Sequence, residues 1–536
     1  MDDDRASLNR LPRWGILALA LVPATVVGLF YLWPLVTLLG TVLNGHSVAD
    51  TLRAPGLGRV VWFTLWQAVV STLATLLVGF VPAYVLARFL VAGRAAVVAA
   101  VTVPFMLPTV VVGAAFLALL PRSLHGTATA VIIAHVFFNI AVVVRLVGAM
   151  WTVIPRDLTA AARTLGASTT QVLRSVVMPL LRPAMFAAAT VVFLFTFTSF
   201  GVVKLLGGPA NPTLEVEIAR RATQLGDVDG AAVLSVVQLI FLAAVLALAA
   251  RWQRRGSITF FGDAAARRPR STGERRLVAG TVTVTLLVMV IPMLALVRRS
   301  LTLGGRWSFD AWRHLGGSEV RPGISLGIDP LASIAVSLRY AVVATLIAVL
   351  AGGLASLFIA AARRRGQLLD VGVMLPLGTS AVTIGLGMLI TFDTAPFDWR
   401  AQWWLVPVGH ALVAIPFVVR ILLPVLRAIP ADQRAAAATL GASPGRTWLA
   451  IDVRSLGRPL APAAGFAAAI SLGEFGATTI LTRTDRETIP IAVGRLLGRA
   501  GDLPRAQGFV LATVLMVLTG VIIAVADIVG RQGRDA

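Results

Sequence analysis

Residues that could do chemistry are few in this sequence, and they do not form groups. The chain has no cysteine, which excludes disulfides, cysteine-bound zinc and thiol catalysis. Its single lysine, Lys204, is followed by Leu205, whereas the phosphate-binding loop of a nucleotide site needs Gly-Lys followed by Ser or Thr. No His, Asp or Glu cluster has metal-ligand spacing, and no nucleophile has a base nearby. We therefore expect that this chain is not an enzyme and binds no metal or cofactor of its own.

One carboxylate, Glu474, lies within an apolar run. A charged side chain inside a membrane costs on the order of 2.5 to 3.5 kcal/mol by insertion scales, and it usually faces a cavity or a partner. Glu474 is therefore a candidate to line a solute path, together with Ser199, its neutral counterpart in the repeat described below. A structural pairing of Glu474 with Arg420 or Arg145 is the alternative.

Histidines and prolines inside apolar runs are the other candidates. His135 and His410 each stand alone in an apolar segment, where a histidine is more often a packed residue with one hydrogen bond than a proton relay. We predict packing for both. Pro108 and Pro376 would free backbone carbonyls and kink their helices, so they are candidates to line a solute path, with packing as the alternative.

The composition requires a membrane for most of the surface. Apolar residues make up 57% of the chain, charged residues make up 13%, and the mean hydropathy is +0.85, far from the balance of a soluble domain. The run from Trp14 to Asn44 has no charged side chain and exceeds the roughly 20 residues that cross a bilayer as a helix. It is too long for the core of a signal peptide, so we predict that it is retained.

Apolar runs of spanning length predict an all-α integral membrane protein with about twelve transmembrane helices, since a helix satisfies its own backbone hydrogen bonds in lipid. The expected organisation is a first six-helix repeat over 1–250, a basic linker over 251–276 and a second six-helix repeat over 277–536. The runs lie near 15–43, 60–90, 95–120, 127–150, 183–206 and 230–250, and then near 277–297, 331–361, 368–391, 402–425, 459–481 and 506–529.

The net charge of +22 is interpreted as the arginine excess of cytoplasmic loops, which fixes orientation by the positive-inside rule, and not as a nucleic-acid interface. The linker 251–276 and the triplet 363–365 are then cytoplasmic. An even number of helices in each half places both termini in the cytoplasm, with the chain in the plasma membrane of a bacterial cell. The basic segment 298–330, expected outside, argues mildly against this orientation.

An internal repeat relates the two halves. His410 lies 275 positions after His135, and the same spacing joins Ile429-Pro430 to Ile154-Pro155. It also aligns the segments 164–168 and 439–443, both of which read Thr-Leu-Gly-Ala-Ser, without a gap. One spacing held over so long a distance predicts a parallel repeat, with both halves in the same orientation around a central path.

A polar loop joins the fourth and fifth expected spans in each half, over 152–182 and 427–458. The first loop has three alanines, a glycine four residues later and then a proline, and the second loop repeats the alanines and the glycine. This pattern resembles the EAA loop of ABC importer permeases, which reads E-A-A, three residues, G, nine residues and I-x-L-P. The matching residues are Ala160, Ala161, Ala162, Gly166 and Pro179 in the first loop, and Ala435, Ala436, Ala437 and Gly441 in the second.

The physical logic of these loops is local. Alanine has a high helix propensity, and a run of alanines gives a low-profile helix face that can seat in a groove of another protein. Gly166 and Gly441 let the chain turn out of that helix. In the family this element is the coupling helix, which docks into the ATPase. The resemblance implies two copies of an ATP-binding subunit, which would use ATP and Mg²⁺, while this chain provides an alternating-access path through the lipid bilayer.

Two departures from the family pattern concern the same loops. Ala160 and Ala435 replace the leading glutamate, which removes a polar contact with the ATPase. Arg454 replaces the proline of the second loop. The geometry with which the chain leaves the second coupling helix is therefore open.

Over nearly its full length the chain most resembles the fused permeases of the thiamine, ferric iron and related binding-protein-dependent systems, as in the segments 206–209 and 213–215. The resemblance implies a small solute delivered by an extracytoplasmic solute-binding protein. Thiamine is favoured, with ferric iron or a polyamine as alternatives. The segments 213–229 and 488–502 are expected to meet that protein, through the candidate contacts Glu215, Glu217, Arg220, Arg221, Arg495 and Arg499.

A twelve-span secondary transporter of the major facilitator kind is the competing class, because it also has two halves in parallel. It predicts coupling through intramembrane acids and a basic loop after the second span, which here is only the short segment 88–94. The polar loops that keep the repeat register follow the fourth span instead. This position favours the ATP-driven importer.

Overall fold

A computed structural model describes residues 12–44, 48–254, 266–316, 319–321, 324–325, 329–362, 366–393, 397–483 and 486–535. Helices dominate these residues, which confirms the all-α membrane class. The predicted arginine triplet 363–365 and the linker residues 255–265 lie outside the described residues. The chain forms two compact units: unit 1 is Met1–Thr51, Ile218–Val236 and Leu303–Ala536, and unit 2 is Leu52–Glu217 and Val237–Thr302.

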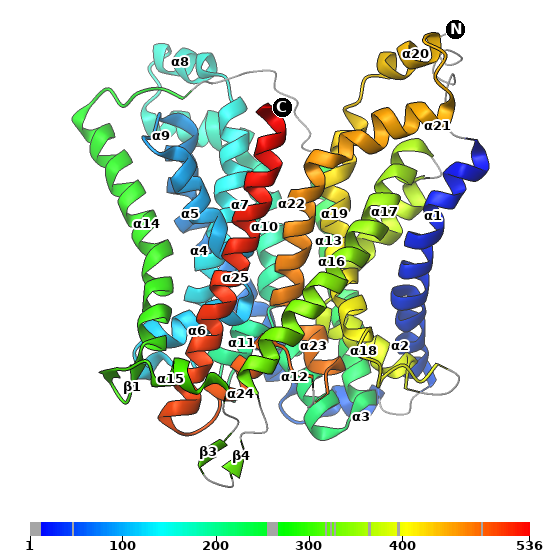
Figure 1. Cartoon of the computed structure of the whole chain (residues 1–536). Helices are drawn as coiled ribbons and strands as arrows, with labels where there is room; N and C mark the ends of the chain where they lie inside the picture. The colour runs from blue at the N-terminus through cyan, green and yellow to red at the C-terminus, as the bar shows by residue number, and fades with distance from the viewer. Residues whose placement is uncertain are drawn as a thin grey trace. The chain divides into compact units, whose positions relative to one another are not determined.

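Unit 2 is built from long helices and the short elements that join them (Figure 1). Four elements, α3 (Val48–Arg53), α12 (Leu214–Arg220), α13 (Val228–Arg254) and β1 (Thr302–Leu303), cross the division between the units. The elements of unit 2 are α4 (Leu57–Arg88), α5 (Arg94–Met106), α6 (Thr109–Leu119), the 3₁₀ turn η3 (Arg122–Leu124), α7 (Ala128–Val153), α8 (Arg156–Thr164), α9 (Thr169–Val172), the π-helix η4 (Leu173–Val177), α10 (Met178–Phe197), α11 (Gly201–Leu206) and α14 (Thr272–Ser300).

Unit 1 repeats this order and adds two small β-hairpins, β1–β2 and β3–β4. Its elements are α1 (Arg13–Val27), η2 (Gly28–Leu32), α2 (Trp33–Asn44), η5 (Arg221–Leu225), β2 (Arg306–Trp307), α15 (Asp310–Arg313), η6 (His314–Gly316), β3 (Glu319–Arg321), β4 (Ile324–Ser325), α16 (Pro330–Ala361), α17 (Gly366–Met374), η7 (Leu375–Gly378), α18 (Ala381–Thr391), α19 (Leu405–Arg427), α20 (Ala431–Thr439), α21 (Pro444–Thr447), the π-helix η8 (Trp448–Val453), α22 (Arg454–Gly473), α23 (Gly476–Leu481), α24 (Ile489–Leu497) and α25 (Asp502–Asp535).

Nine helices of the described residues are long and apolar enough to cross a membrane, and the number rises to eleven if each of two bent helix pairs counts as one span. The prediction of about twelve spans is therefore approximate. The remaining predicted span corresponds to α22, which begins at Arg454 and is rich in alanine and glycine. α22 is not among the nine candidate spans.

Each unit contains the first span of the opposite half of the sequence. In unit 1, α1 packs on α16 and α17, and α2 packs on α18. The Tyr31 hydroxyl in η2 lies 2.6 Å from the Thr379 hydroxyl. In unit 2, α14 packs on α4, α5 and α6. The compact units are thus not the same as the two sequence repeats, although each repeat retains its own order of elements.

The third predicted span of each half is a sharply bent pair of helices. α5 and α6 meet at 103°, and the α17–η7 segment meets α18 at 104°. Pro108 directly precedes α6 and Pro376 lies within η7, which agrees with the helix-breaking effect of proline. Both prolines are buried. Their place in a solute path therefore stays a prediction.

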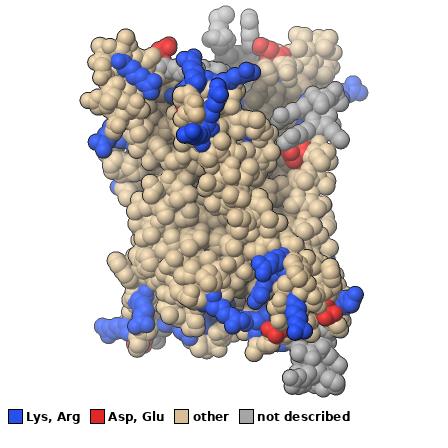
Figure 2. Space-filling view, turned by 90° about the vertical axis from the view of Figure 1, so that its left-hand side faces the viewer, with Lys and Arg blue, Asp and Glu red and all other residues tan. Residues whose placement is uncertain are grey.

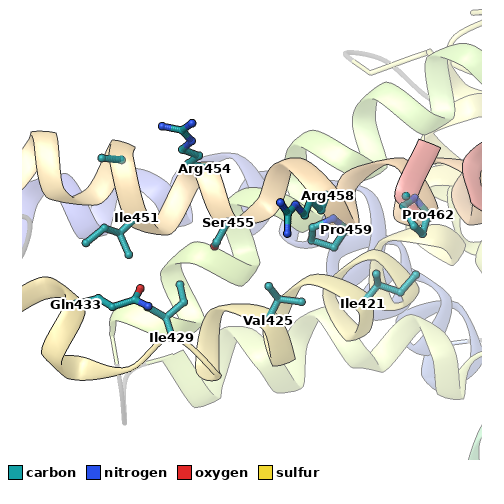
Figure 3. Close-up of a pocket in the computed structure, with 12 residues that line it drawn as sticks. Ile421, Val425, Ile429, Gln433, Ile451, Arg454, Ser455, Arg458, Pro459 and Pro462 are labelled. Atoms are coloured by element: carbon teal, nitrogen blue, oxygen red, sulfur yellow. The ribbon is translucent and has the colours of Figure 1, made fainter. Parts of the chain in front are cut away.

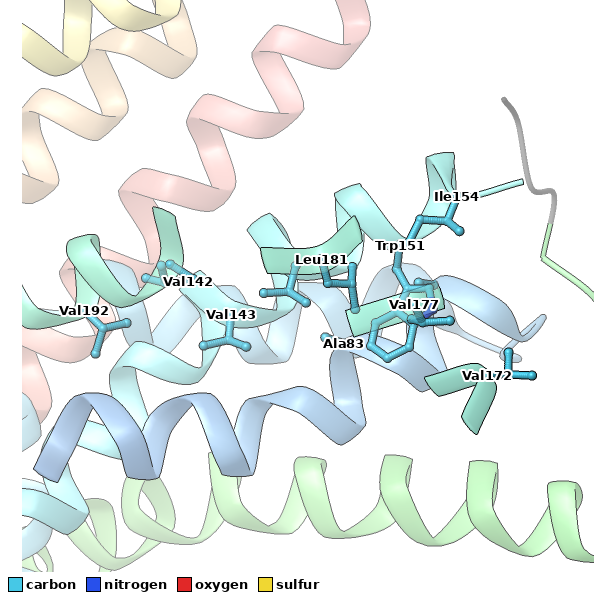
Figure 4. Packing of buried hydrophobic residues seen from close by; sticks show 12 residues of the cluster. Ala83, Val142, Val143, Trp151, Ile154, Val172, Val177, Leu181 and Val192 are labelled. Atoms are coloured by element: carbon cyan, nitrogen blue, oxygen red, sulfur yellow. The ribbon is translucent and has the colours of Figure 1, made fainter. Parts of the chain in front are cut away.

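The core of unit 2 is a cluster of apolar side chains to which the first polar loop contributes Val172 and Val177 (Figure 4). Trp151 packs its ring 5.0 Å from the rings of both Phe80 and Tyr84. The cluster contains Ala83, Ala87, Val142, Val143, Val147, Trp151, Ile154, Val172, Val177, Leu181, Ala188 and Val192.

On the surface that Figure 2 shows, charged side chains gather towards the two ends and the area between them is uncharged. This distribution is what a bilayer requires.

The described end of the linker is held to unit 2. The Leu90 amide donates to the Arg267 carbonyl at 2.8 Å, and the Arg267 amide donates to the Arg88 carbonyl at 3.1 Å. The Arg267 guanidinium lies over the Phe89 ring and pairs with Glu274. Hydrogen bonding to Glu274 raises the pKa of Arg267. These contacts fix the start of α14 beside the end of α4.

Candidate coupling segments and buried polar sites

The first polar loop folds as a short exposed helix followed by a glycine turn. α8 begins after Pro155, and Ala160 and Ala161 are exposed while Ala162 is half-buried. The Ala167 amide donates to the Ala162 carbonyl at 3.0 Å, and the Gly166 amide donates to the Arg163 carbonyl at 2.9 Å. With Gly166 at φ +84°, these bonds form a Schellman motif, which favours glycine at the left-handed position. The predicted turn at Gly166 is confirmed.

The second polar loop has the same ending. Ala435 and Ala436 of α20 are exposed, and Ala437 is half-buried. Gly441 has φ +77°. The Ala442 amide donates to the Ala437 carbonyl at 3.0 Å, and the Gly441 amide donates to the Ala438 carbonyl at 3.0 Å. The turn predicted at Gly441 is therefore confirmed as well.

Each glycine turn leads through a capped turn of helix into a π-helix. Ser168 caps α9 in a capping box with Gln171, and Ser443 caps α21. The π-helices η4 and η8 follow at the same register. Met178 and its counterpart Val453 have helical φ values of −61° and −67°, and Arg454, which follows Val453, also has a helical φ of −62°. The arginine in place of proline thus leaves the helical exit from the second loop unchanged.

An exposed leucine, not predicted as a site residue, precedes each glycine. Leu165 is 88% exposed and Leu440 is 86% exposed. The two loops thus expose a large apolar side chain at the same position of the repeat. The signal was present in the sequence, because both leucines belong to the repeated Thr-Leu-Gly-Ala-Ser segment.

His135 is the centre of a small buried polar site in unit 2. Its side chain is fully buried, with Nδ1 3.3 Å from the Ser71 hydroxyl and Nε2 2.9 Å from the Ser199 hydroxyl. Ser199 is also buried. The predicted packed histidine is therefore found, with two hydroxyl partners where one was expected.

Glu474 forms the corresponding site in unit 1 with His410. Its carboxylate accepts hydrogen bonds from the amides of Ala477 and Thr478, at 3.0 and 2.9 Å, and from the Thr478 hydroxyl at 2.8 Å. His410 Nε2 lies 3.5 Å from the carboxylate, and its Nδ1 lies 2.8 Å from the Ser471 hydroxyl. The carboxylate thus caps the start of α23, where the helix dipole favours a negative charge.

The alternative prediction, a pairing of Glu474 with an arginine, is wrong for Arg420, because His410 and the α23 amides are the partners of Glu474. Arg420 instead lies 3.9 Å from Asp370, and Arg145 is exposed. The sequence could not reveal the actual partners, because the amides that receive the carboxylate become free only where α22 ends and α23 begins. Path lining by Glu474 and Ser199 stays a prediction.

The candidate contacts with a binding protein divide into buried and exposed groups. Glu215 is 1% exposed and Glu217 is 6% exposed, so their prediction as an exposed face is corrected. Glu215 accepts a hydrogen bond from Gln238 Nε2 at 2.5 Å, and both glutamates lie in the first turn of α12, where acidic residues are favoured. Arg220 is exposed.

The arginines of these segments are held by acidic neighbours or by burial. Arg221 pairs with Asp227 at 2.9 Å, and Arg495 pairs with Glu487. Burial, with Arg499 nearby, lowers the pKa of Arg495. Arg499 is half-buried. Among the described residues no group of three or more His, Asp or Glu side chains could hold a metal ion.

Comparisons with known proteins agree with this arrangement. Residues 77–257 match the family described as binding-protein-dependent transport system inner membrane component. The chain is 29% identical to the thiamine transport system permease protein ThiP of Brucella suis, over 93% of this chain and 94% of that protein. It is 25% identical to ThiP of Escherichia coli, over 88% and 89% of the two chains. A probable ABC transporter permease protein of Sinorhizobium fredii is 25% identical, over 96% and 94%.

The helical membrane fold, the two matching loops and these similarities define the class. These findings support a fused permease of the ABC importer type, with both repeats in one polypeptide. The similarity to these transport permease proteins extends over nearly their full length.

Proposed function

We propose that this chain is the permease subunit of a thiamine importer, and that α8 and α20 are its two coupling helices. The observation that carries the proposal is the identical ending of both helices, with three alanines, an exposed leucine and a left-handed glycine. Each helix would seat in one copy of an ATP-binding subunit. That subunit would bind ATP and Mg²⁺ and carry out hydrolysis, so the permease itself would need no cofactor and would not be an enzyme.

The proposed solute comes from the relatives. Several proteins similar over most of this chain carry the name of thiamine transport permeases, which supports thiamine over ferric iron or a polyamine. The solute would arrive on an extracytoplasmic binding protein. Among the candidate contacts, the exposed Arg220 and the partly exposed Arg495 and Arg499 are the accessible ones.

The proposed orientation places both loops and both termini in the cytoplasm of a bacterial cell. Because the chain has no cysteine, single cysteines report the side of the membrane without background. Leu165→Cys and Leu440→Cys should react with a membrane-impermeant maleimide only after the cells are opened. Trp307→Cys, on the exposed β1–β2 hairpin, should react in intact cells. Labelling of Leu165→Cys or Leu440→Cys in intact cells would exclude docking to a cytosolic ATPase.

Uptake of labelled thiamine into proteoliposomes tests the function directly. The chain is reconstituted with its ATP-binding subunit and binding protein. Thiamine uptake should then occur only when ATP and Mg²⁺ are present on the side of the membrane that carries the ATP-binding subunit. Uptake driven by an ion gradient without ATP would favour the secondary transporter. ATP-dependent uptake of ferric iron or a polyamine, with no thiamine uptake, would retain the class and change the solute.

A further inference from the structure

A cavity of about 790 Å³ lies at the second coupling segment, between the end of α19 and the start of α22 (Figure 3). Its α19 wall is apolar and includes Ile421 and Val425. In Figure 3, Ser455 and Arg458 extend from α22 towards that wall, while Arg454 points away from it at the rim. The lining also includes Gly530, near the end of α25. The cavity therefore has an apolar wall along spanning helices and a basic opening where those helices end.

Arg454 and Arg458 carry the positive charge at this cavity. Among the residues that the structure describes, Arg454 and Arg458 form no ion pair, and both are exposed. The nearest acidic residue in the sequence, Asp452, is already paired with Arg434. The Arg458 guanidinium thus faces the α19 wall of the cavity, with the Arg454 guanidinium at the rim and the Ser455 hydroxyl between them in the sequence.

The first half of the chain has no such polar lining at the equivalent positions. At the repeat spacing, Arg454 and Arg458 correspond to Pro179 and Pro183, while Ser455 and Gln433 correspond to Leu180 and Leu158. Leu180 packs against the apolar cluster of unit 2. All four polar residues of the cavity thus replace proline or leucine. The polar lining is therefore specific to the second half and is not needed for the shared loop fold.

We propose that this cavity binds an anionic phospholipid, with the phosphate at Arg454 and Arg458 and an acyl chain along Ile421 and Val425. Basic pockets between transmembrane helices recognise the head groups of anionic lipids through charge. Arginine suits a phosphate because its planar guanidinium donates two parallel hydrogen bonds. A free phosphate would use only the arginines, whereas a phospholipid also covers the apolar wall. The two kinds of lining in one cavity favour the lipid.

The test measures lipid binding to the full chain purified in detergent, by native mass spectrometry during titration with phosphatidylglycerol. The Arg454→Ala/Arg458→Ala variant should bind roughly thirtyfold more weakly, because each basic residue near an anionic surface contributes a factor of about five. Ser455→Trp, which keeps both charges and occupies part of the cavity, should also weaken binding. The matched control Arg268→Ala/Arg270→Ala removes two exposed linker arginines and should bind like the unmodified chain.

Three results would overturn the proposal. The first is unchanged phosphatidylglycerol binding in both cavity variants. The second is binding of phosphatidylcholine as strong as that of phosphatidylglycerol, which would mean that the arginines do not recognise the charge of the head group. The third is displacement of the lipid by millimolar inorganic phosphate, which would identify a free-anion site. The assay contains no ATPase and measures no transport, so its outcome is independent of the proposed function.

Discussion

The two proposed coupling segments, 152–182 and 427–458, have the same backbone fold. Different side-chain contacts hold each segment to the helices of its own unit. In the first half, Val177 of η4 is buried in the apolar cluster. In the second half its counterpart is Asp452, which pairs with Arg434 of α20 at 2.5 Å, and a cavity lies alongside. Pro155, Gly166 and Ser168 of the first loop recur as proline, glycine and serine at the equivalent positions of the second loop. Backbone geometry and side-chain attachment can therefore diverge independently.

Trp151→Ala should produce the largest loss of stability, because it removes a large buried side chain from the apolar cluster that holds the first segment. A loss of about 3–5 kcal/mol in the free energy of unfolding is expected for such a cavity. Chemical denaturation in detergent measures it. Ile451→Ala, which truncates a half-buried residue at the cavity of the second half, is the matched control and should lose far less. Equal losses in the free energy of unfolding would show that the side chains at the apolar cluster and at the cavity stabilise the protein to the same extent.

Arg434→Ala should destabilise the chain by about 1–3 kcal/mol, because it leaves the mostly buried Asp452 carboxylate without its partner. The double variant Arg434→Thr/Asp452→Val carries the residues that the first half has at these positions, Thr159 and Val177. It should recover part of the loss, since neither side chain then needs a partner. A double variant less stable than Arg434→Ala would show that apolar side chains cannot replace the Arg434–Asp452 ion pair in the second segment.

Gly166→Val and Gly441→Val should each cost about 1–2 kcal/mol of local stability, because a side chain is strained at these left-handed positions. Nothing lies within 4 Å of the added Cβ at either site, so the effect is on the backbone turn. Uptake per ATP hydrolysed should fall while membrane insertion is retained. Gly445→Ala, at a helical position with equal space, is the control. Normal coupling in both valine variants would contradict the assignment of the loops.

Leu165→Ser and Leu440→Ser should have the smallest effect on stability, within about 0.5 kcal/mol, because both side chains are exposed. They should nevertheless weaken retention of the ATP-binding subunit during affinity purification. Leu449→Ser changes another exposed leucine of the second loop and serves as the control. A similar loss for all three variants would mean that the leucines before the glycines have no special part in docking.

Several features of the site could be predicted from the sequence because they depend on neighbouring residues. The alanine run and Gly166 determine a helix and its left-handed end through helix propensity and the freedom of glycine at positive φ. The bends near Pro108 and Pro376 follow from the missing amide hydrogen of proline. The same local rules apply 275 positions later, which is why the second loop could be predicted from the first.

Other features could not be predicted, because they depend on contacts distant in the sequence. The charge of Glu474 indicated a partner, but the choice of His410 and the α23 amides over Arg420 depends on where two helices meet. The sequence indicated Glu215 and Glu217 as contacts of a binding protein, whereas both side chains are buried.

By itself, the sequence determined the membrane class, the duplication and the glycine turns of the two polar loops, since hydropathy, repeat spacing and turn chemistry depend on consecutive residues. The tertiary structure alone decided that α14 packs on α4, α5 and α6 and that α1 packs on α16. In lipid, all apolar helix faces are chemically similar, so association depends on detailed packing and on a few polar contacts. That packing is a property of assembled helices and has no signature in the composition of any one of them.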